Sequence, residues 1–343
     1  MISFNNDYSE GAHPNILNAL IETNFEQTDG YGEDYYTNLA YEKIKTALNC
    51  DDCHIRFLVG GTQTNLVVIS HLLRPHQAVI SSDVGHINVH ETGAIEVTGH
   101  KVLTTEKIKD GKLTSETIKK VLDIHTDAHM VQPKMVYLSN PNELGAIYTK
   151  EELKNIYEFC KENNLYFYID GARLSSALAS EKNNIDLSDY KDLCDILYIG
   201  ATKSGALFGE AVVFFNLSLV GDFQYSIKLR GALLAKGRLL GIQFNELFKN
   251  NLFVEIGKHA NKMAKKIKDI FVKNNIPFVV DSYSNQLFVI FSNELIKKLS
   301  DKYKFSIIEK YDENNTVVRF VTSWATKEEN VDEFIKDFKE IIK

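Results

Sequence analysis

Short apolar runs alternate with amphipathic stretches along most of this sequence, and that alternation restricts the fold more than any other feature. LYFYID at 165–170 and DILYIG at 195–200 are aromatic and β-branched runs of strand length. Residues 150–164 carry apolar side chains at helical spacing, with Glu and Lys pairs on the polar side. Strands and helices in this order predict an α/β fold, in which a mostly parallel sheet is covered by helices on both faces.

The same patterns divide the chain into two parts. Further strands are predicted at 54–61, 78–83, 134–140 and 210–215, and further helices at 37–48 and 62–74. The first forty residues are polar and rich in turn formers, and residues 231–273 are helical in pattern. The tail differs, with predicted strands at 278–291, 305–311 and 315–324 and a closing helix at 327–342. We therefore predict a large domain over 1–248, which includes an N-terminal arm, and a small α+β domain over 249–343.

Charge and composition argue against several classes of function. The formal net charge of −7 disfavours broad binding to nucleic acid or to an anionic membrane. No apolar run approaches the ~20 residues that cross a bilayer, and no basic segment followed by an apolar one is visible at the N-terminus. We therefore expect a cytoplasmic protein. Cys50 and Cys53 form a C-x-x-C without a second such pair, so no metal site is predicted.

An acid and a lysine follow two of the predicted strands, at the edge where open parallel sheets bind their ligands. Asp170 ends the run at 165–170 and Arg173 comes shortly after it, whereas Lys203 lies among small residues after the run at 195–200. Taken singly, Asp170 can be the cap of the next helix, and Lys203 can be a solvated loop residue. Their meaning depends on what else reaches the same edge.

A glycine pair supplies the third component of a site. Gly60 and Gly61 precede a helix that begins near Thr62, so backbone N–H groups and the helix dipole can hold an anion such as phosphate. A phosphate cradle, an acid and a lysine at neighbouring strand ends are together what pyridoxal phosphate requires. Lys203 would form a Schiff base with the cofactor aldehyde, and Asp170 would keep the ring nitrogen protonated.

Seven segments carry a resemblance to a known family: NDYSEGAHP, GYGEDYY, GGTQTNLV, GHINVHETGA, YIDGARL, GATKSGALFGE and VVRFVTSW. They extend over nearly the whole chain, and their order and spacing resemble the threonine aldolase group of fold-type I pyridoxal phosphate enzymes. That group is classified together with the aromatic amino-acid β-eliminating lyases. The resemblance implies the fold-type I, transferase-like architecture and a homotetramer built from tight dimers.

The resemblance also implies a role for each residue at a matching position. The catalytic residues would be the Schiff-base lysine, the acid at the ring nitrogen and a histidine stacked on the ring, which are Lys203, Asp170 and His86. Further cofactor contacts would come from Gly61, Thr62, Thr202, Arg173 and Arg238. The arginine at 238 is expected to reach a phosphate, often across a subunit interface. The substrate would contact Asn6, Tyr31, Arg173 and Arg319. A guanidinium can hold the substrate carboxylate with two hydrogen bonds and so fix its orientation.

The implied reaction is cleavage of the Cα–Cβ bond of β-hydroxy-α-amino acids. L-threonine or L-allo-threonine would give glycine and acetaldehyde, and phenylserine is a further candidate substrate. The base that removes the hydroxyl proton is unassigned, and His86 acting through a water is preferred over His90 and Glu91. Two alternatives stay open. One is a β-eliminating lyase that releases pyruvate and ammonia, and the other is a pyridoxal phosphate-binding protein without turnover.

One departure from the family pattern lies in SNPNELGAIY at 139–148. Many aldolases carry a histidine in this loop, which has been linked to the substrate β-hydroxyl, whereas this chain has Pro141, Asn142 and Glu143 there. The lysine motif is TKSG instead of SKG, although the lysine itself is kept. The reaction subtype and the threo or erythro preference therefore stay open.

Overall fold

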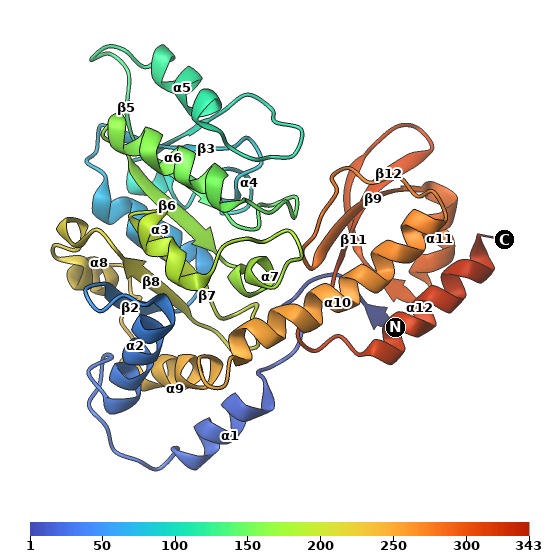
Figure 1. The fold of residues 1–343 in the computed structure, drawn as a ribbon, viewed down its shortest axis with the longest axis horizontal. Coiled ribbons are helices and arrows are strands. Elements are labelled where there is room, and N and C mark those ends of the chain that lie inside the picture. The colour runs from blue at the N-terminus through green and yellow to red at the C-terminus, as the bar shows by residue number, and fades with distance from the viewer. Residues whose placement is uncertain (343) are drawn as a thin grey trace.

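The computed structural model describes residues 1–342, and a seven-stranded sheet forms the centre of its larger part (Figure 1). The strands lie in the order β2-β8-β7-β6-β5-β3-β4. In chain order they are β2 (His54–Leu58), β3 (Gln77–Ser81), β4 (Lys101–Thr104), β5 (Gln132–Ser139), β6 (Tyr166–Gly171), β7 (Ile196–Gly200) and β8 (Glu210–Phe214). Strand β8 is antiparallel to β2 and β7, and the other neighbours in this sheet are parallel. The predicted α/β class with a mostly parallel sheet is confirmed.

Both faces of this sheet are buried, because successive residues of a strand point to opposite hydrophobic cores. In β6, Phe167 and Ile169 belong to one core and Tyr168 belongs to the other. The first core is covered by α2 (Tyr35–Leu48), α6 (Lys150–Glu162) and α9 (Arg238–Leu247), and the second by α3 (Gly61–Leu72) and α8 (Phe223–Leu229). Strands that are buried on both sides need no polar alternation, which explains the mostly apolar sequences of the fully buried strands β7 and β8.

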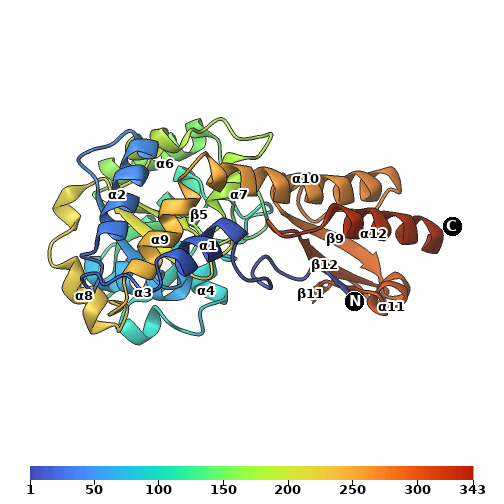
Figure 2. The ribbon, with the colours of Figure 1, turned by 90° about the horizontal axis from the view of Figure 1, so that it is seen from below.

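The C-terminal part is a smaller α+β unit beside the large one (Figures 1 and 2). Its antiparallel sheet has the order β11-β12-β9, formed by β9 (Gln286–Ser292), β11 (Ser306–Lys310) and β12 (Asn315–Val321). Helices α10 (Leu252–Lys273), α11 (Asn293–Ser300) and α12 (Glu328–Ile341) accompany it. Phe271, Phe320 and Phe334 pack edge to face or tilted in its core.

Helix α10 connects the two parts, and its buried residues change cores along its length. Phe253 and Ile256 belong to the core of the large part, whereas Met263 and Ile267 belong to the core of the small part. Gly257 lies between these pairs, and a Cβ there would come 2.0 Å from the Ser175 carbonyl oxygen. Glycine therefore permits the close approach of α10 to the large part. The domain boundary after residue 248 stays a prediction, since it depends on how this shared helix is divided.

Several short elements were not predicted from the sequence. They are α1 (Pro14–Glu22), α4 (His86–Val89), β4, α5 (Ser115–Ile124), α7 (Leu174–Leu178) and α11. In α1 only Ile16 is fully buried, whereas the apolar side chains of Leu17 and Ile21 are exposed. No helix within residues 1–342 is both long and apolar enough to cross a membrane.

Two predicted elements differ in extent from the structure. Residues 278–285 are not part of a strand, since β9 begins at Gln286. Their buried polar side chains bond to other loops instead of facing a neighbouring strand: Ser282 Oγ donates to the Gly145 carbonyl oxygen, and the Asn285 amide donates to the Thr322 carbonyl oxygen. The helical pattern over 231–273 also divides into α9 and α10, which are preceded by irregular chain at 231–237.

The N-terminal arm contacts both parts of the molecule. Strand β1 (Ile2–Ser3) pairs in parallel with β10 (Tyr303–Lys304) of the small part, and Phe4 lies in the small core. Farther along the arm, α1 lies against α9 of the large part (Figure 2). The residues between β1 and α1 therefore cross the junction of the two parts.

Candidate active site

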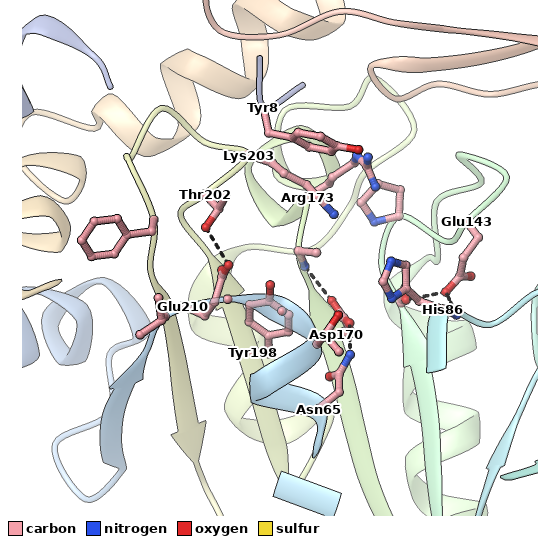
Figure 3. A pocket seen from close by; sticks show the side chains of 18 of the residues that line it. Tyr8, Asn65, His86, Glu143, Asp170, Arg173, Tyr198, Thr202, Lys203 and Glu210 are labelled. Atoms are coloured by element: carbon pink, nitrogen blue, oxygen red, sulfur yellow. Dashed lines mark hydrogen bonds between the residues drawn. The ribbon is translucent and has the colours of Figure 1, made fainter. Parts of the chain in front are cut away.

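A cavity of about 290 Å³ lies at the carboxyl ends of β6 and β7, beside the N-terminus of α3 (Figure 3). It is lined by most of the residues predicted to bind cofactor, namely Gly61, Thr62, His86, Asp170, Arg173, Thr202 and Lys203. These residues are distant in sequence but converge because the carboxyl ends of parallel strands share one edge of the sheet. Their convergence is a finding of the structure, and their individual roles stay predictions.

Lys203 lines the cavity, and among residues 1–342 no carboxylate forms an ion pair with its amine. It follows β7 in a tight turn that Gly205 allows, since a φ of +84° favours glycine. Burial lowers the pKa of the Lys203 amine, and the guanidinium of Arg173 lowers it further, against the opposing charges of Asp7 and Asp170. Within residues 1–342 no hydrogen bond to this amine contributes to the shift. A lysine with a lowered pKa is neutral at lower pH than usual, and a neutral amine can attack an aldehyde carbon.

Asp170 is fixed at the end of β6 by three hydrogen-bond donors. Its Oδ2 accepts the Tyr137 hydroxyl at 2.7 Å and the Asn65 side-chain amide at 3.1 Å. Its Oδ1 accepts the Ala172 backbone N–H at 2.8 Å. Since a carboxylate oxygen has two lone pairs, Oδ1 can accept one more donor from the cavity. A protonated ring nitrogen is a donor of that kind.

His86 belongs to a hydrogen-bonded chain that leads to Asp170. His86 Nδ1 lies 2.7 Å from Glu91 Oε1, which also accepts the Asn65 amide at 2.7 Å. The same amide donates to Asp170, and its oxygen accepts the Tyr168 hydroxyl. Burial raises the pKa of Glu91, and the hydrogen bonds from His86 and Asn65 oppose that rise. With Glu91 ionised, the His86 proton sits on Nδ1 and Nε2 is left as an acceptor.

The N-terminus of α3 forms the predicted anion cradle. The Thr64 N–H is bonded back to the Gly60 carbonyl oxygen, so the N–H groups before it have no helical acceptor. A Cβ at Gly61 would lie 2.9 Å from the Tyr198 hydroxyl, which restricts this position to a residue without a side chain. Backbone N–H groups can therefore approach a bound anion closely at this helix end.

Two arginines lie near the cavity, and they differ in how their donors are used. Arg173 donates from Nε to Asp7 Oδ2 at 2.7 Å and from Nη2 to Asp7 Oδ1 at 3.1 Å. Asp7 also accepts the Asn285 amide at 2.9 Å. Arg319 makes one bond, of 3.3 Å, from Nη2 to Ser306 Oγ, and its buried Nε has no partner within residues 1–342. A buried donor without a partner is costly, so Arg319 is suited to a carboxylate supplied by a ligand.

Asp7 was not assigned a role from the sequence. Burial alone would raise the pKa of the Asp7 carboxyl, but the charges of Arg173 and Lys203 lower it overall. Its carboxylate therefore stays ionised and orients the Arg173 guanidinium. Burial lowers the pKa of Arg319, and the neighbouring positive charge of Arg173 adds to that effect. Two neighbouring guanidinium groups that repel each other are stabilised when an anion binds between them.

Several predicted residues do not line this cavity. Arg319 is one of them, although its guanidinium lies near that of Arg173. Asn6 accepts hydrogen bonds from the Tyr8 N–H and the Ser9 hydroxyl within its own turn. Arg238 donates to the carbonyl oxygens of Thr23, Asn24 and Glu26. Tyr31 borders a separate, much smaller hollow. Of the weaker base candidates, Glu91 lies behind His86, and His90 has a pKa that burial lowers. Neither Glu91 nor His90 lines the cavity.

The cavity wall also contains residues that were not assigned roles from the sequence: Tyr8, Asn65, Glu143, Tyr198 and Glu210. Tyr198 and Glu210 lie on the adjacent strands β7 and β8, and the register of these strands brings both side chains to the cavity. Thr202 donates to Glu210 at 2.7 Å, and burial raises the pKa of Glu210 to about 8. For Glu143 the sequence offered one signal, its position in the loop where a histidine was expected.

The overall fold places the chain in a known structural class. An aspartate aminotransferase from Thermus thermophilus superposes with a TM-score of 0.70 over 99% of this chain and 91% of that one, at 14% identity. The architecture is therefore that of the fold-type I pyridoxal phosphate enzymes.

Sequence similarity narrows this class to a family. The chain belongs to the beta-eliminating lyase family, whose sequence model matches residues 7–294. A low specificity L-threonine aldolase from a Pseudomonas species is 30% identical, with 99% of this chain and 97% of that protein covered. The structure of a threonine aldolase from Leishmania major is 45% identical and has a TM-score of 0.99, with all of both chains covered. The family predicted from the motifs is confirmed.

Proposed function

We propose that this chain binds pyridoxal 5′-phosphate in the cavity and cleaves the Cα–Cβ bond of β-hydroxy-α-amino acids, with L-threonine and L-allo-threonine as the first candidate substrates. The proposal rests above all on one observation. Lys203, Asp170 and the N-terminus of α3 converge on a single cavity, in a chain similar over its whole length to threonine aldolases. It is a carbon–carbon lyase of the threonine aldolase type.

The residues in the cavity fit this cofactor. Lys203 offers an amine with a lowered pKa, Asp170 has a free acceptor position, and the helix end at Gly61 and Thr62 can take the phosphate. When bound, pyridoxal phosphate supplies an aldehyde for a lysine and an electron sink for the substrate Cα. His86 would cover the ring on the face opposite Lys203, held in place by its bond to Glu91.

The two arginines would hold the substrate carboxylate. Arg173 is oriented by Asp7, and Arg319 has a donor without a partner within residues 1–342. Two hydrogen bonds from a guanidinium fix the rotation of the carboxylate, and therefore select which Cα bond is aligned for cleavage. Both arginines are largely withdrawn from water, so their charge acts on the substrate with little screening.

The first test of this function is a product assay. Protein supplied with pyridoxal phosphate is expected to convert L-allo-threonine, L-threonine or phenylserine into aldehyde and glycine in equal amounts. Aldehyde, glycine, pyruvate and ammonia are measured in the same samples, with Lys203→Ala protein as the background control. Absence of product from all three substrates, with cofactor bound, would support a pyridoxal phosphate-binding protein without turnover.

β-Elimination is the second candidate, because the matching family model is that of the beta-eliminating lyases. In that reaction Lys203 would remove the α-proton of a substrate such as a serine or cysteine derivative. The same assay separates the two reactions. Pyruvate and ammonia without aldehyde would move the assignment to elimination.

We also propose that the chain assembles as a homotetramer of dimers. Large apolar side chains are exposed near the end of α1, at the start of α2 and on α8: Ile21, Phe25, Tyr35, Tyr225 and Leu229. Exposed apolar groups that gather in this way are typical of surfaces that another chain covers. Arg238 holds the segment after α1 through its carbonyl oxygens, and Tyr31 lies in the same region. A second copy on this surface would bring both residues toward its own cavity.

Light scattering of the purified protein is expected to give the mass of four chains, with dimers as the species formed on dilution. A stable monomer that retains full aldolase activity would contradict the assembly and the proposed roles of Tyr31 and Arg238.

A further inference from the structure

We propose that Glu143 is the residue that takes the proton from the substrate β-hydroxyl group. This inference rests on the function proposed above and names the base that the sequence left unassigned. In the step, the Glu143 carboxylate takes the hydroxyl proton, the C–O bond becomes a carbonyl, and the Cα–Cβ bond breaks. The electron pair stays with the glycine fragment, whose Cα then takes one proton, so the proton lost at oxygen is balanced by the proton gained at carbon.

The geometry places a Glu143 carboxyl oxygen at the cavity. Glu143 lies in the loop after β5 and lines the cavity wall. Its Oε1 accepts the Ser139 hydroxyl and the His86 backbone N–H, each at 2.8 Å. For the part of the chain that the structure describes, the bonds from Ser139 and His86 both go to Oε1. Oε2 is therefore free to accept a proton from a ligand.

Figure 3 shows where this group stands relative to the other site residues. Glu143 lies beside the His86 ring, across the cavity from Thr202 and Glu210. The phosphate cradle and Lys203 are supplied by other elements, α3 and the turn after β7. The side of the cavity near Glu143 is thus left for the part of the substrate that extends beyond Cα.

The environment of Glu143 suits proton exchange. Burial raises the pKa of its carboxyl, the hydrogen bonds from Ser139 and His86 lower it, and the negative charge of Asp170 raises it again. A carboxylate whose pKa is closer to neutral is a stronger base than a solvated one, and general bases work best when their pKa is near the operating pH. The carboxyl is also anchored at one oxygen, so the other is held in a defined position.

His86 is the alternative base, and its contacts favour a different role. Its Nδ1 is bonded to Glu91, which fixes the ring in the position expected for stacking on the cofactor. Its backbone N–H is bonded to Glu143, so the two residues support each other. A ring that covers the cofactor face is positioned less directly toward a hydroxyl on Cβ than a carboxyl at the cavity edge.

The test compares Glu143→Gln with the unchanged protein in two reactions. Glutamine keeps the size of the side chain and an acceptor for Ser139 and His86, but it cannot take a proton. The turnover number for L-allo-threonine cleavage is expected to fall by about 10²-fold or more. Exchange of the glycine α-hydrogen with deuterated water, which involves no hydroxyl group, is expected to stay within about threefold, as are cofactor absorbance and the KM for threonine.

Glu143→Ala provides a second, independent measurement. Formate fits the space left by the missing carboxyl and is expected to restore part of the cleavage rate in a concentration-dependent manner, with no effect on the unchanged protein. Cleavage by Glu143→Gln at near-normal rate would overturn the role of Glu143 and return the assignment to His86. Equal losses of cleavage and glycine exchange would show that Glu143 is structural. If the unchanged protein makes no aldehyde, the proposed function fails first, and this inference fails with it.

Discussion

Lys203→Ala protein is expected to lose the visible absorbance of the bound cofactor and at least about 10³-fold of its turnover number, since it lacks the amine that joins the cofactor. The effect is large because the structure offers no substitute: within residues 1–342, Lys203 is the lysine that lines the cavity. Absorbance spectra of the protein titrated with pyridoxal phosphate measure the first effect, and the aldehyde assay measures the second. An unchanged spectrum would contradict the role of Lys203.

A matched control and a pH titration sharpen this experiment. Lys258 is exposed on α10 and paired with Glu255, so Lys258→Ala should leave spectrum and turnover unchanged. The lowered pKa of Lys203 predicts how the rate of cofactor loading depends on pH. Below that pKa the amine is protonated and cannot attack the aldehyde, so loading is slow. Above it the amine is neutral, so loading is faster, and the midpoint should lie below that of a solvated lysine.

Arg319→Ala is expected to raise the KM for amino-acid substrates by about 10²-fold while cofactor affinity changes by less than about threefold. A charge-assisted, bidentate hydrogen bond to a carboxylate contributes about 2–3 kcal/mol in a desolvated site, which corresponds to this change. Arg319 is free to make that bond because it makes a single long bond to Ser306 and its Nε has no partner within residues 1–342. Substrate saturation curves and cofactor titrations of the same preparation provide the two quantities.

Arg319→Lys separates the contribution of the positive charge from that of the bidentate hydrogen-bond geometry. Lysine keeps the positive charge but cannot form the two parallel bonds of a guanidinium, so its KM should fall between those of the unchanged and the alanine protein. Removal of a buried charge that lacks an ion pair should not destabilise the fold, and thermal unfolding should confirm this. If substrate and cofactor affinity fall together, Arg319 has a structural role and the carboxylate contact lies elsewhere.

The sequence was informative where a physical rule links local pattern to position. The strand ends that carry Asp170 and Lys203 were predictable, because buried strands have uniformly apolar sequences and parallel strands share one carboxyl edge. The same rule placed Gly61 at a helix N-terminus. The mostly parallel sheet followed from the alternation of strands and helices. A short element such as α1 was missed because its nine residues make few turns and stand in a segment rich in polar residues and turn formers.

Contacts between distant segments could not be predicted. The pairing of Asp7 with Arg173 joins positions 166 residues apart, and no local pattern marks either residue as the partner of the other. The chain from His86 through Glu91 and Asn65 likewise depends on how α3 and the loop after β3 meet. Strand register, which only the structure supplies, was needed to bring Glu210 to the cavity.

Because of the N-terminal arm, the central sheet and the substrate-carboxylate site of a newly made chain form at different times. Strand β1 pairs with residues 303–304, and Asp7 bonds to Asn285, so residues of the arm have partners that are synthesised much later. The central sheet uses strands between residues 54 and 214 and can assemble on a nascent chain well before those partners exist. The Asp7 carboxylate that orients Arg173 then lacks its contact with Asn285 until that residue has been made. An incomplete chain can thus hold a folded sheet while its carboxylate site is still unformed.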